Sequence, residues 1–349
     1  MTPFIVLVVI STLTTGTLVV VSATNWLLVW MVLEINTIAV LPLMARSHSP
    51  RAVEATTKYF LTQSIAAALL LLGSLSNIFL TGHWNVMQVS HPLPVTIITL
   101  ALAIKMGMAP THAWLPEVLQ GIDLSAGLIL STLQKLAPFA ILLQLQPSDQ
   151  TLIMGFGIAS VLVGGWGGLN QTQLRKILAY SSIAHMGWML LVLQFQPKLA
   201  LLVFFIYLIM TTSMFLVFKL NHVTTIYGLG TSWSKSPILM VLTPLILLSL
   251  AGLPPLSGFM PKLMVLLEYT KQELYIVGVM AAFSALLSLY FYLRMAYAMG
   301  LTTFPSAISG LTSWRVSPKS SLPLSLSVTS VATVMLFPMA PAILACLTW

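Results

Sequence analysis

Apolar stretches of about twenty residues follow one another along almost the whole chain. Of its 349 residues, 58% are hydrophobic and only 6% are charged, whereas a soluble domain typically carries about 25% charged residues. A stretch of about twenty apolar residues is the length that a helix needs to cross a membrane. Lipid offers no partner to the edge of an open sheet. The sequence therefore predicts an all-α polytopic membrane protein.

Hydropathy and turn residues together predict eleven transmembrane helices. The first segment lacks the basic flank and the cleavage site of a signal peptide, so we expect it to be a retained helix. No separate soluble domain fits between the spans. The predicted spans cover residues 3–23, 25–45, 56–80, 92–114, 124–146, 150–170, 175–195, 198–221, 237–267, 274–299 and 322–346.

Basic residues flank the spans mainly on one side of the membrane. The other side holds only Lys198 and Lys271. The positive-inside rule then predicts that the N-terminus lies on the basic side and the C-terminus on the other. Because these residues are dispersed along membrane boundaries, a nucleic-acid partner is not expected. The basic side holds Arg46, Arg51, Lys58, Arg175, Lys176, Lys219, Lys235, Arg294, Arg315 and Lys319.

Four charged residues lie inside the predicted spans: Glu34, Lys105, Lys135 and Lys262. A charge in the membrane interior is costly, and it usually marks an ion or proton pathway. Lys105 and Lys135 are too deep for their side chains to reach the interface easily, whereas Lys262 could do so if its span began at Leu256. These four residues are the candidate proton carriers.

Glycine and proline interrupt two of the charged spans, the fourth and the ninth. Proline removes a backbone donor, so such breaks persist in a membrane only where protein or water satisfies the backbone. The breaks occupy corresponding places if residues 1–147 and 148–300 form two five-helix inverted repeats, followed by a loop and a C-terminal helix in 301–349. The breaks contain Gly107, Pro110, His112 and Pro116 in the fourth span, and Gly252, Pro254, Pro255, Gly258 and Pro261 in the ninth.

Two histidines are secondary candidates for the same pathway. His112 follows the first break, and His185 lies within its span beside hydroxyl side chains. A purely structural role is at least as compatible with either position. The single cysteine, Cys346, cannot supply the thiolates of an iron–sulfur cluster. No zinc-type ligand cluster or phosphate-binding glycine loop is apparent, so we expect no cofactor and no metal bound by this chain.

Glu34 and Lys105 have two alternative interpretations. They form either a static ion pair or a switchable pair in which movement of one charge changes the proton affinity of the other. Unit charges about 6 Å apart at an effective dielectric of about 20 interact by roughly 2.8 kcal/mol, about a hundredfold in a proton-binding equilibrium. That is enough to switch a poised lysine.

Five ordered motifs resemble the subunit 2 family of the proton-pumping NADH:ubiquinone oxidoreductase, respiratory complex I, in its animal mitochondrial form. That family belongs to the antiporter-like subunits, which also resemble subunits of sodium/proton antiporters. Bacterial members generally have fourteen helices, and the eleven expected here match the shortened animal version. The motifs are WMVLEIN (30–36), PRAVEA with KYF (50–60), KMG with HAWLP (105–116), LAYSSIAHMG (178–187) and GLPPLSGF (252–259).

The resemblance implies roles for the four buried charges. Glu34 would be the family's helix glutamate, Lys105 its broken-helix lysine, Lys135 the central lysine between half-channels and Lys262 the charge of the second broken helix. The first motif often has a second histidine after its Leu-Pro pair. Here residues 118–120 are Val-Leu-Gln, which argues against an entry route through that histidine.

The resemblance also implies a cellular setting and a function. The chain would carry protons in the mitochondrial inner membrane, with its N-terminus in the matrix and its C-terminus in the intermembrane space. It would contact neighbouring antiporter-like and small hydrophobic subunits, accessory subunits and phospholipids. NADH, FMN, iron–sulfur clusters and ubiquinone would be used by other subunits, with no redox centre or NADH site here. The alternatives are a stand-alone cation/proton antiporter and a purely structural subunit.

Overall fold

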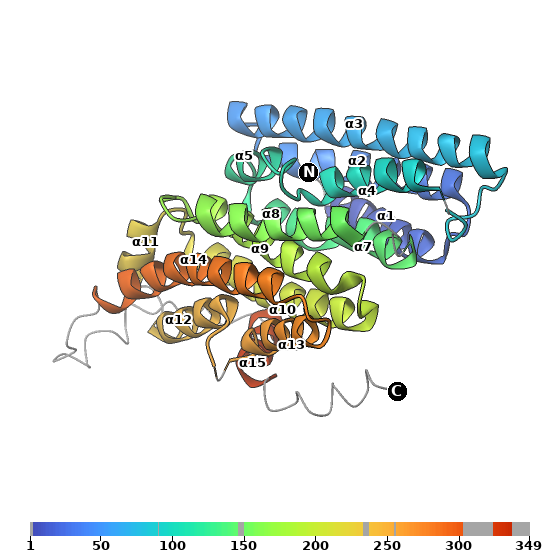
Figure 1. Ribbon diagram of the computed structural model, residues 1–349. Helices are drawn as coiled ribbons and strands as arrows, with labels where there is room; N and C mark the ends of the chain where they lie inside the picture. Colours follow the sequence, from blue (N-terminus) through green and yellow to red (C-terminus); the bar gives the residue numbers. More distant parts are fainter. Residues whose placement is uncertain are drawn as a thin grey trace. The chain divides into compact units, whose positions relative to one another are not determined.

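The computed structural model of this chain describes residues 3–89, 91–145, 150–232, 237–254, 256–302 and 324–336. Within these ranges the regular elements are helices, accompanied by two isolated β-bridges (Figure 1). Eight described helical stretches, one of them Leu124–Leu145, are long and apolar enough to cross a membrane, and three shorter apolar helices accompany them. The all-α prediction is therefore confirmed.

Some predicted features lie outside the described residues. They are Pro255 of the second break, the basic residues Lys235, Arg315 and Lys319, and Cys346. The eleventh predicted span, 322–346, is described only over residues 324–336.

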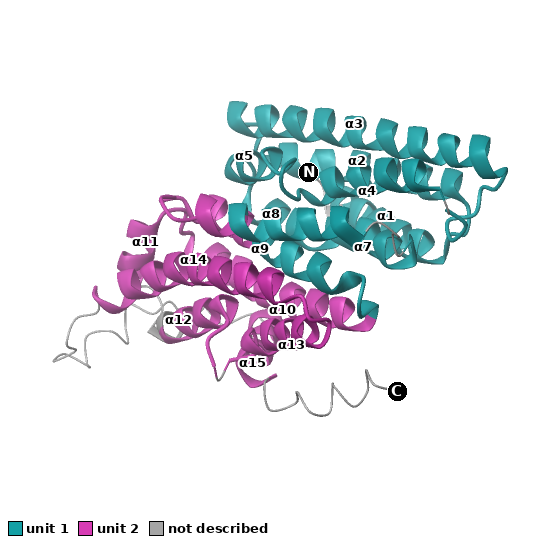
Figure 2. Ribbon diagram, in the orientation of Figure 1, with its two compact units in different colours: residues 1–163, 182–197 teal, residues 164–181, 198–349 magenta. Residues whose placement is uncertain are grey.

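The chain forms two compact units (Figure 2). Unit 1 comprises residues 1–163 and 182–197, and unit 2 comprises residues 164–181 and 198–349. Helices α8 and α9 contribute residues to both units, so the division does not fall at the ends of helices.

Unit 1 is organised around the long helix α3, which packs against α2, α4 and α5 (Figure 1). Helix α3 begins at Pro50, six residues before the predicted start. Ser49 caps it, because its hydroxyl accepts a hydrogen bond from the Ala52 amide, and proline suits the first helical position. The helices are α1 Pro3–Ser22, α2 Trp26–Met44, η1 Ala45–Ser47, α3 Pro50–Thr81, α4 Pro92–Met106, α5 Trp114–Gly121, α6 Leu124–Ser131, α7 Leu133–Leu145, α8 Gln150–Gly167 and α9 Leu174–Leu193.

Unit 2 packs α14 against α11, α12 and α13, and α15 against α12. The short helix α11 occupies a stretch that the sequence marks only as a polar break. The Thr225 hydroxyl caps α11 by accepting from the Gly228 amide. The helices are α10 Pro197–Asn221, α11 Ile226–Thr231, α12 Pro237–Ala251, α13 Phe259–Lys271, α14 Tyr275–Gly300 and α15 Leu324–Met335.

Each unit contains one antiparallel β-bridge with the same hydrogen-bond pattern. In unit 1, Asn25 before α2 pairs with Asn85 after α3, and their neighbours Trp26 and Val86 donate to carbonyls on the opposite segment, at 3.0 and 2.8 Å. In unit 2, the same bridge joins residue 173 before α9 to residue 225 after α10. The amides of residues 174 and 226 then donate across it, at 3.0 and 3.1 Å.

The two predicted interruptions occur where glycine and proline place them. Helix α4 ends at Met106 and the chain resumes as α5 at Trp114, while α12 ends at Ala251 and α13 begins at Phe259. Gly107 and Gly252 follow the first half-helices with φ of 73° and 81°, a left-handed conformation that favours glycine. The second half-helices extend to residues 121 and 271, beyond the predicted ends at 114 and 267.

A third interruption divides the predicted fifth span. Helix α6 ends at Ser131 and α7 begins at Leu133, because Thr132 departs from helical geometry, with φ −114° and ψ −75°. No glycine or proline marks this position, and the sequence does not predict it.

Candidate functional site

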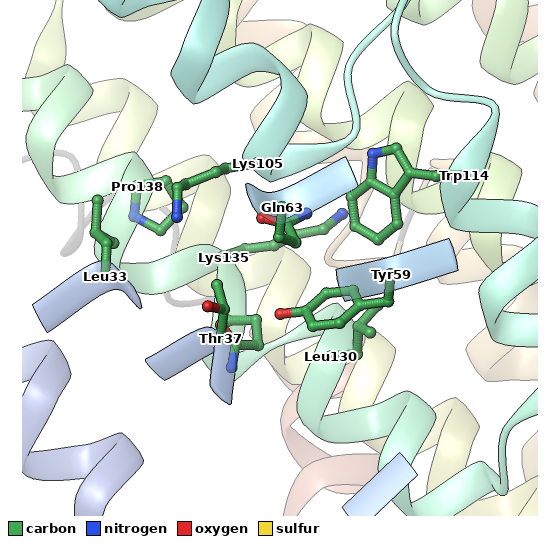
Figure 3. A pocket seen from close by; sticks show the side chains of 10 residues that line it. Leu33, Thr37, Tyr59, Gln63, Lys105, Trp114, Leu130, Lys135 and Pro138 are labelled. Carbon is green, nitrogen blue, oxygen red and sulfur yellow. The ribbon is translucent and has the colours of Figure 1, made fainter. Parts of the chain in front are cut away.

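A buried cavity in unit 1 brings two of the predicted lysines together. Lys105 and Lys135 both line it (Figure 3). It offers about 10 Å³ of space for the centre of a water molecule, which is about what one water needs. Its other lining residues, from α2, α3, α5, α6 and α7, are Leu33, Thr37, Tyr59, Gln63, Trp114, Leu130, Gln134 and Pro138.

Lys105 lies in the last turn of α4, immediately before the break. The sequence places it within a span that glycine and proline interrupt, and in the structure it is one residue from the end of the first half-helix. A cation near a helix C-terminus is stabilised by the helix dipole. The residue is buried, and its Nζ has no hydrogen-bond partner. A buried ammonium without a partner is costly, so this position favours a lysine that exchanges its proton.

Glu34 lies in α2 and is half-buried. Its Oε2 has no hydrogen-bond partner, although the carboxylate interacts electrostatically with Lys105. Among the described residues, ion pairs within 4.0 Å are formed by Lys58 with Glu54 and Glu117 and by Lys271 with Glu268. Glu34 and Lys105 do not form one, so the static contact ion pair is not present.

Lys135 lies in the first turns of α7 and is fully buried. The irregular residue Thr132 precedes it, and Pro138 lies within the same helix. Because Pro138 has no amide hydrogen, the carbonyl of Gln134 cannot make its usual helical bond. Both Gln134 and Pro138 line the cavity, so Lys135 lies in a helix whose backbone is irregular on either side of it.

Uncharged polar residues complete the cavity, and sequence reasoning missed them. Tyr59 and Gln63 are four residues apart on α3 and therefore share one face. Both are buried and both line the cavity, together with Thr37 and Gln134. Their only sequence signal is polarity at helical spacing inside an otherwise apolar stretch.

The indole of Trp114 closes the first break. It packs against Tyr59, with ring centroids 5.8 Å apart, and its Nε1 donates to the carbonyl of Ile104 at 3.1 Å. The same carbonyl accepts from the Gly107 amide. A side chain from α5 thereby supplies a hydrogen-bond donor to a carbonyl in the last turn of α4.

Replacing Trp114 with phenylalanine should lower the free energy of unfolding by about 1 kcal/mol, beyond the cost of the smaller ring, because one hydrogen bond is lost. Trp26→Phe is the control, since the buried Trp26 Nε1 has no partner to lose. Thermal unfolding of the protein in detergent measures both. Equal losses in the two variants would contradict a role for this bond.

Lys262 lies in unit 2, where it provides a hydrogen-bond donor to a backbone carbonyl at the second break. Its Nζ donates to the carbonyl of Ala251, the last residue of α12, at 2.7 Å. A Cβ at Gly252 would lie 2.9 Å from Cδ of this lysine and 3.0 Å from its Nζ. The side chain therefore folds back onto the end of the preceding half-helix.

The two histidine candidates lie outside the lining of the cavity. His112 is half-buried in the first break, with Nδ1 3.2 Å from the Pro110 carbonyl. His185 is buried in α9. Among the residues that the structure describes, no group of three or more His, Cys, Asp or Glu side chains could hold a metal ion.

Comparisons with known proteins identify the family of the chain. Residues 23–288 match the family model of the transmembrane region of NADH:quinone oxidoreductase and Mrp antiporters, and residues 289–344 match the model of the NADH dehydrogenase subunit 2 C-terminus. The chain is 59% identical to NADH-ubiquinone oxidoreductase chain 2 of Tetraodon nigroviridis, covering 99% of both chains, and 55% identical to that of Salmo salar, covering 100% of both.

A solved structure of respiratory complex I from Thermus thermophilus contains a chain with the same fold. The TM-score is 0.83 at 28% identity, covering 97% of this chain and 78% of that one. Given the full-length identity to the fish proteins, the chain belongs to the NADH-ubiquinone oxidoreductase chain 2 family.

Proposed function

We propose that this chain is a proton-translocating membrane subunit of mitochondrial NADH:ubiquinone oxidoreductase. The observation that carries the proposal is the cavity that two buried lysines share, beside a half-buried glutamate that interacts electrostatically with one of them. Family membership supplies the setting, since the relatives are named as chain 2 of that enzyme.

In the proposed mechanism, quinone chemistry in other subunits changes the charge near Glu34. The shift alters the proton affinity of Lys105, which passes a proton toward Lys135 and on to Lys262. Two arrangements support these steps: the shared cavity for the first transfer, and the anchoring of Lys262 at a helix break. His112 and His185 remain secondary candidates, because neither lines the cavity.

We also propose that residues 1–147 and 148–300 are two repeats of one five-helix design, followed by a C-terminal segment in 301–349. The matching β-bridges support this, since each joins the start of a repeat's second helix to the segment after its third. The left-handed glycine after each first half-helix supports it too.

The same proposal includes the orientation of the chain in the membrane, the cofactors of other subunits and the partners of this one. The distribution of basic loops supports an N-terminus in the matrix and a C-terminus in the intermembrane space of the inner membrane. NADH, FMN, iron–sulfur clusters and ubiquinone are assigned to other subunits. Neighbouring antiporter-like, small hydrophobic and accessory subunits, with phospholipids, would cover the exposed apolar faces of helices such as α1 and α14.

Two substitutions at Lys135 test this proton relay, the proposed transfer from Lys105 through Lys135 to Lys262, in the assembled complex. Lys135→Met removes the charge, while Lys135→Arg keeps it but cannot release a proton. We expect both variants to translocate fewer protons per electron in reconstituted vesicles, with assembly checked separately. Normal pumping by assembled Lys135→Arg would show that only a fixed charge is needed. Ion transport by the purified chain alone would favour a stand-alone transporter.

A further inference from the structure

Gln63 is an uncharged residue of the cavity that has no role in the proposed relay and whose amide nitrogen lacks a hydrogen-bond partner. It lies on α3, only 3% exposed, and its Nε2 has no hydrogen-bond partner. A buried amide donor without a partner destabilises the fold, so its retention requires a reason. We propose that Gln63 positions one water molecule between Lys105 and Lys135 and so controls proton transfer between them. This inference rests on the proposed relay and names a further residue of it.

Two other hydrogen-bonding side chains of the cavity are committed to the backbone. Gln134 donates its amide to the Asn36 carbonyl at 2.9 Å, and the hydroxyl of Thr37 donates to the Glu34 carbonyl at 2.7 Å. Gln63 has no such contact through its nitrogen, and Figure 3 shows its amide among the side chains that surround the cavity.

The size of the cavity suits this role. Its space of about 10 Å³ admits a single water, and a buried water needs two to four polar partners. Lys105 Nζ is itself buried without a partner in the same lining. One water bound to Lys105, Lys135 and the Gln63 amide would satisfy both orphaned groups together.

The transfer balances with that water alone. An N–H bond of the Lys105 ammonium breaks as its proton bonds to the water oxygen. A different proton leaves the water for the amine lone pair of Lys135. The amide nitrogen of Gln63 donates a hydrogen bond to the water oxygen, which fixes the orientation of the water and so the direction of the transferred proton. Lys105 ends neutral, Lys135 ends as an ammonium, and the water is regenerated.

The test compares Gln63→Met with Leu70→Met in the assembled complex. Methionine has nearly the shape of glutamine but cannot hold a water. Leu70 is buried on the same helix and lies outside the cavity lining, so it controls for methionine itself. In Gln63→Met we expect coupled turnover to fall about fivefold, as for the loss of one hydrogen bond in the transition state. The KM for quinone should be unchanged, and the solvent deuterium isotope effect on turnover should increase.

A conservative variant separates positioning from packing. Gln63→Asn keeps the amide on a shorter arm, so it should recover part of the turnover and of the normal isotope effect. The inference is overturned if Gln63→Met turns over normally, or if its activity falls only in proportion to the amount assembled with an unchanged isotope effect. If Gln63→Met behaves normally while Lys105→Met loses pumping, only this inference fails. If Lys105→Met pumps normally, the relay fails as well.

Discussion

Lys105→Met should leave the complex assembled while lowering coupled quinone reduction by about a hundredfold, the low end of the range for loss of a positioned acid–base group. The lysine is buried with no hydrogen bond to lose, and methionine has a similar shape without the charge. Stability should therefore hold or rise while proton transfer stops at this position. Protons translocated per electron, measured in vesicles, should fall along with turnover.

Lys219→Met is the matched control for Lys105→Met. Lys219 is exposed in the last turn of α10 and is one of the lysines that membrane topology explains. We expect its loss to leave proton translocation unchanged. An unchanged proton-to-electron ratio in assembled Lys105→Met would contradict the relay.

Adding Glu34→Gln to the Lys105→Met complex tests whether the two residues act in series. If Glu34 acts only through its charge on Lys105, the double variant should be no worse than Lys105→Met alone, while Glu34→Gln alone should be impaired. Fully additive losses in proton translocation would instead indicate that Glu34 acts through a different residue.

Hydropathy and helix-breaking residues predict most of the helices and their interruptions, because these features depend on the residues of the local segment alone. The interruptions at Gly107 and Gly252 follow from residues that favour left-handed backbone. The irregular turn at Thr132 was missed, since no residue type marks it. Helix α3 also begins earlier than expected, because an N-cap at Ser49 extends it into a polar stretch that hydropathy excludes.

The candidate site is predictable only in its charged members. Lys105 and Lys135 stand out because a charge in an apolar span is rare. Tyr59 and Gln63 carry no charge, so their membership of the cavity depends on how α3 packs against α4 and α5. Likewise, no sequence pattern indicates that Lys262 turns back to the carbonyl of Ala251.

Gly258→Ala should lower the free energy of unfolding by about 3 kcal/mol, because it overpacks the second break against a backbone that cannot yield easily. An added Cβ would lie 1.8 Å from the carbonyl oxygen of Ser249, in the last turn of α12. That turn also carries the Ala251 carbonyl that binds Lys262, so displacing it should disturb the relay too. The expected result is less assembled complex, with fewer protons per electron in what remains.

Gly155→Ala provides the control of opposite sign. Gly155 lies within α8, where an added Cβ would meet nothing within 4 Å, so alanine should stabilise that helix by up to about 1 kcal/mol. Thermal unfolding and the amount of assembled complex measure both variants. If Gly258→Ala gave the same thermal unfolding and the same amount of assembled complex as Gly155→Ala, the second break would not depend on the close packing of Gly258 against Ser249. The anchoring of Lys262 would then depend on its own hydrogen bond alone.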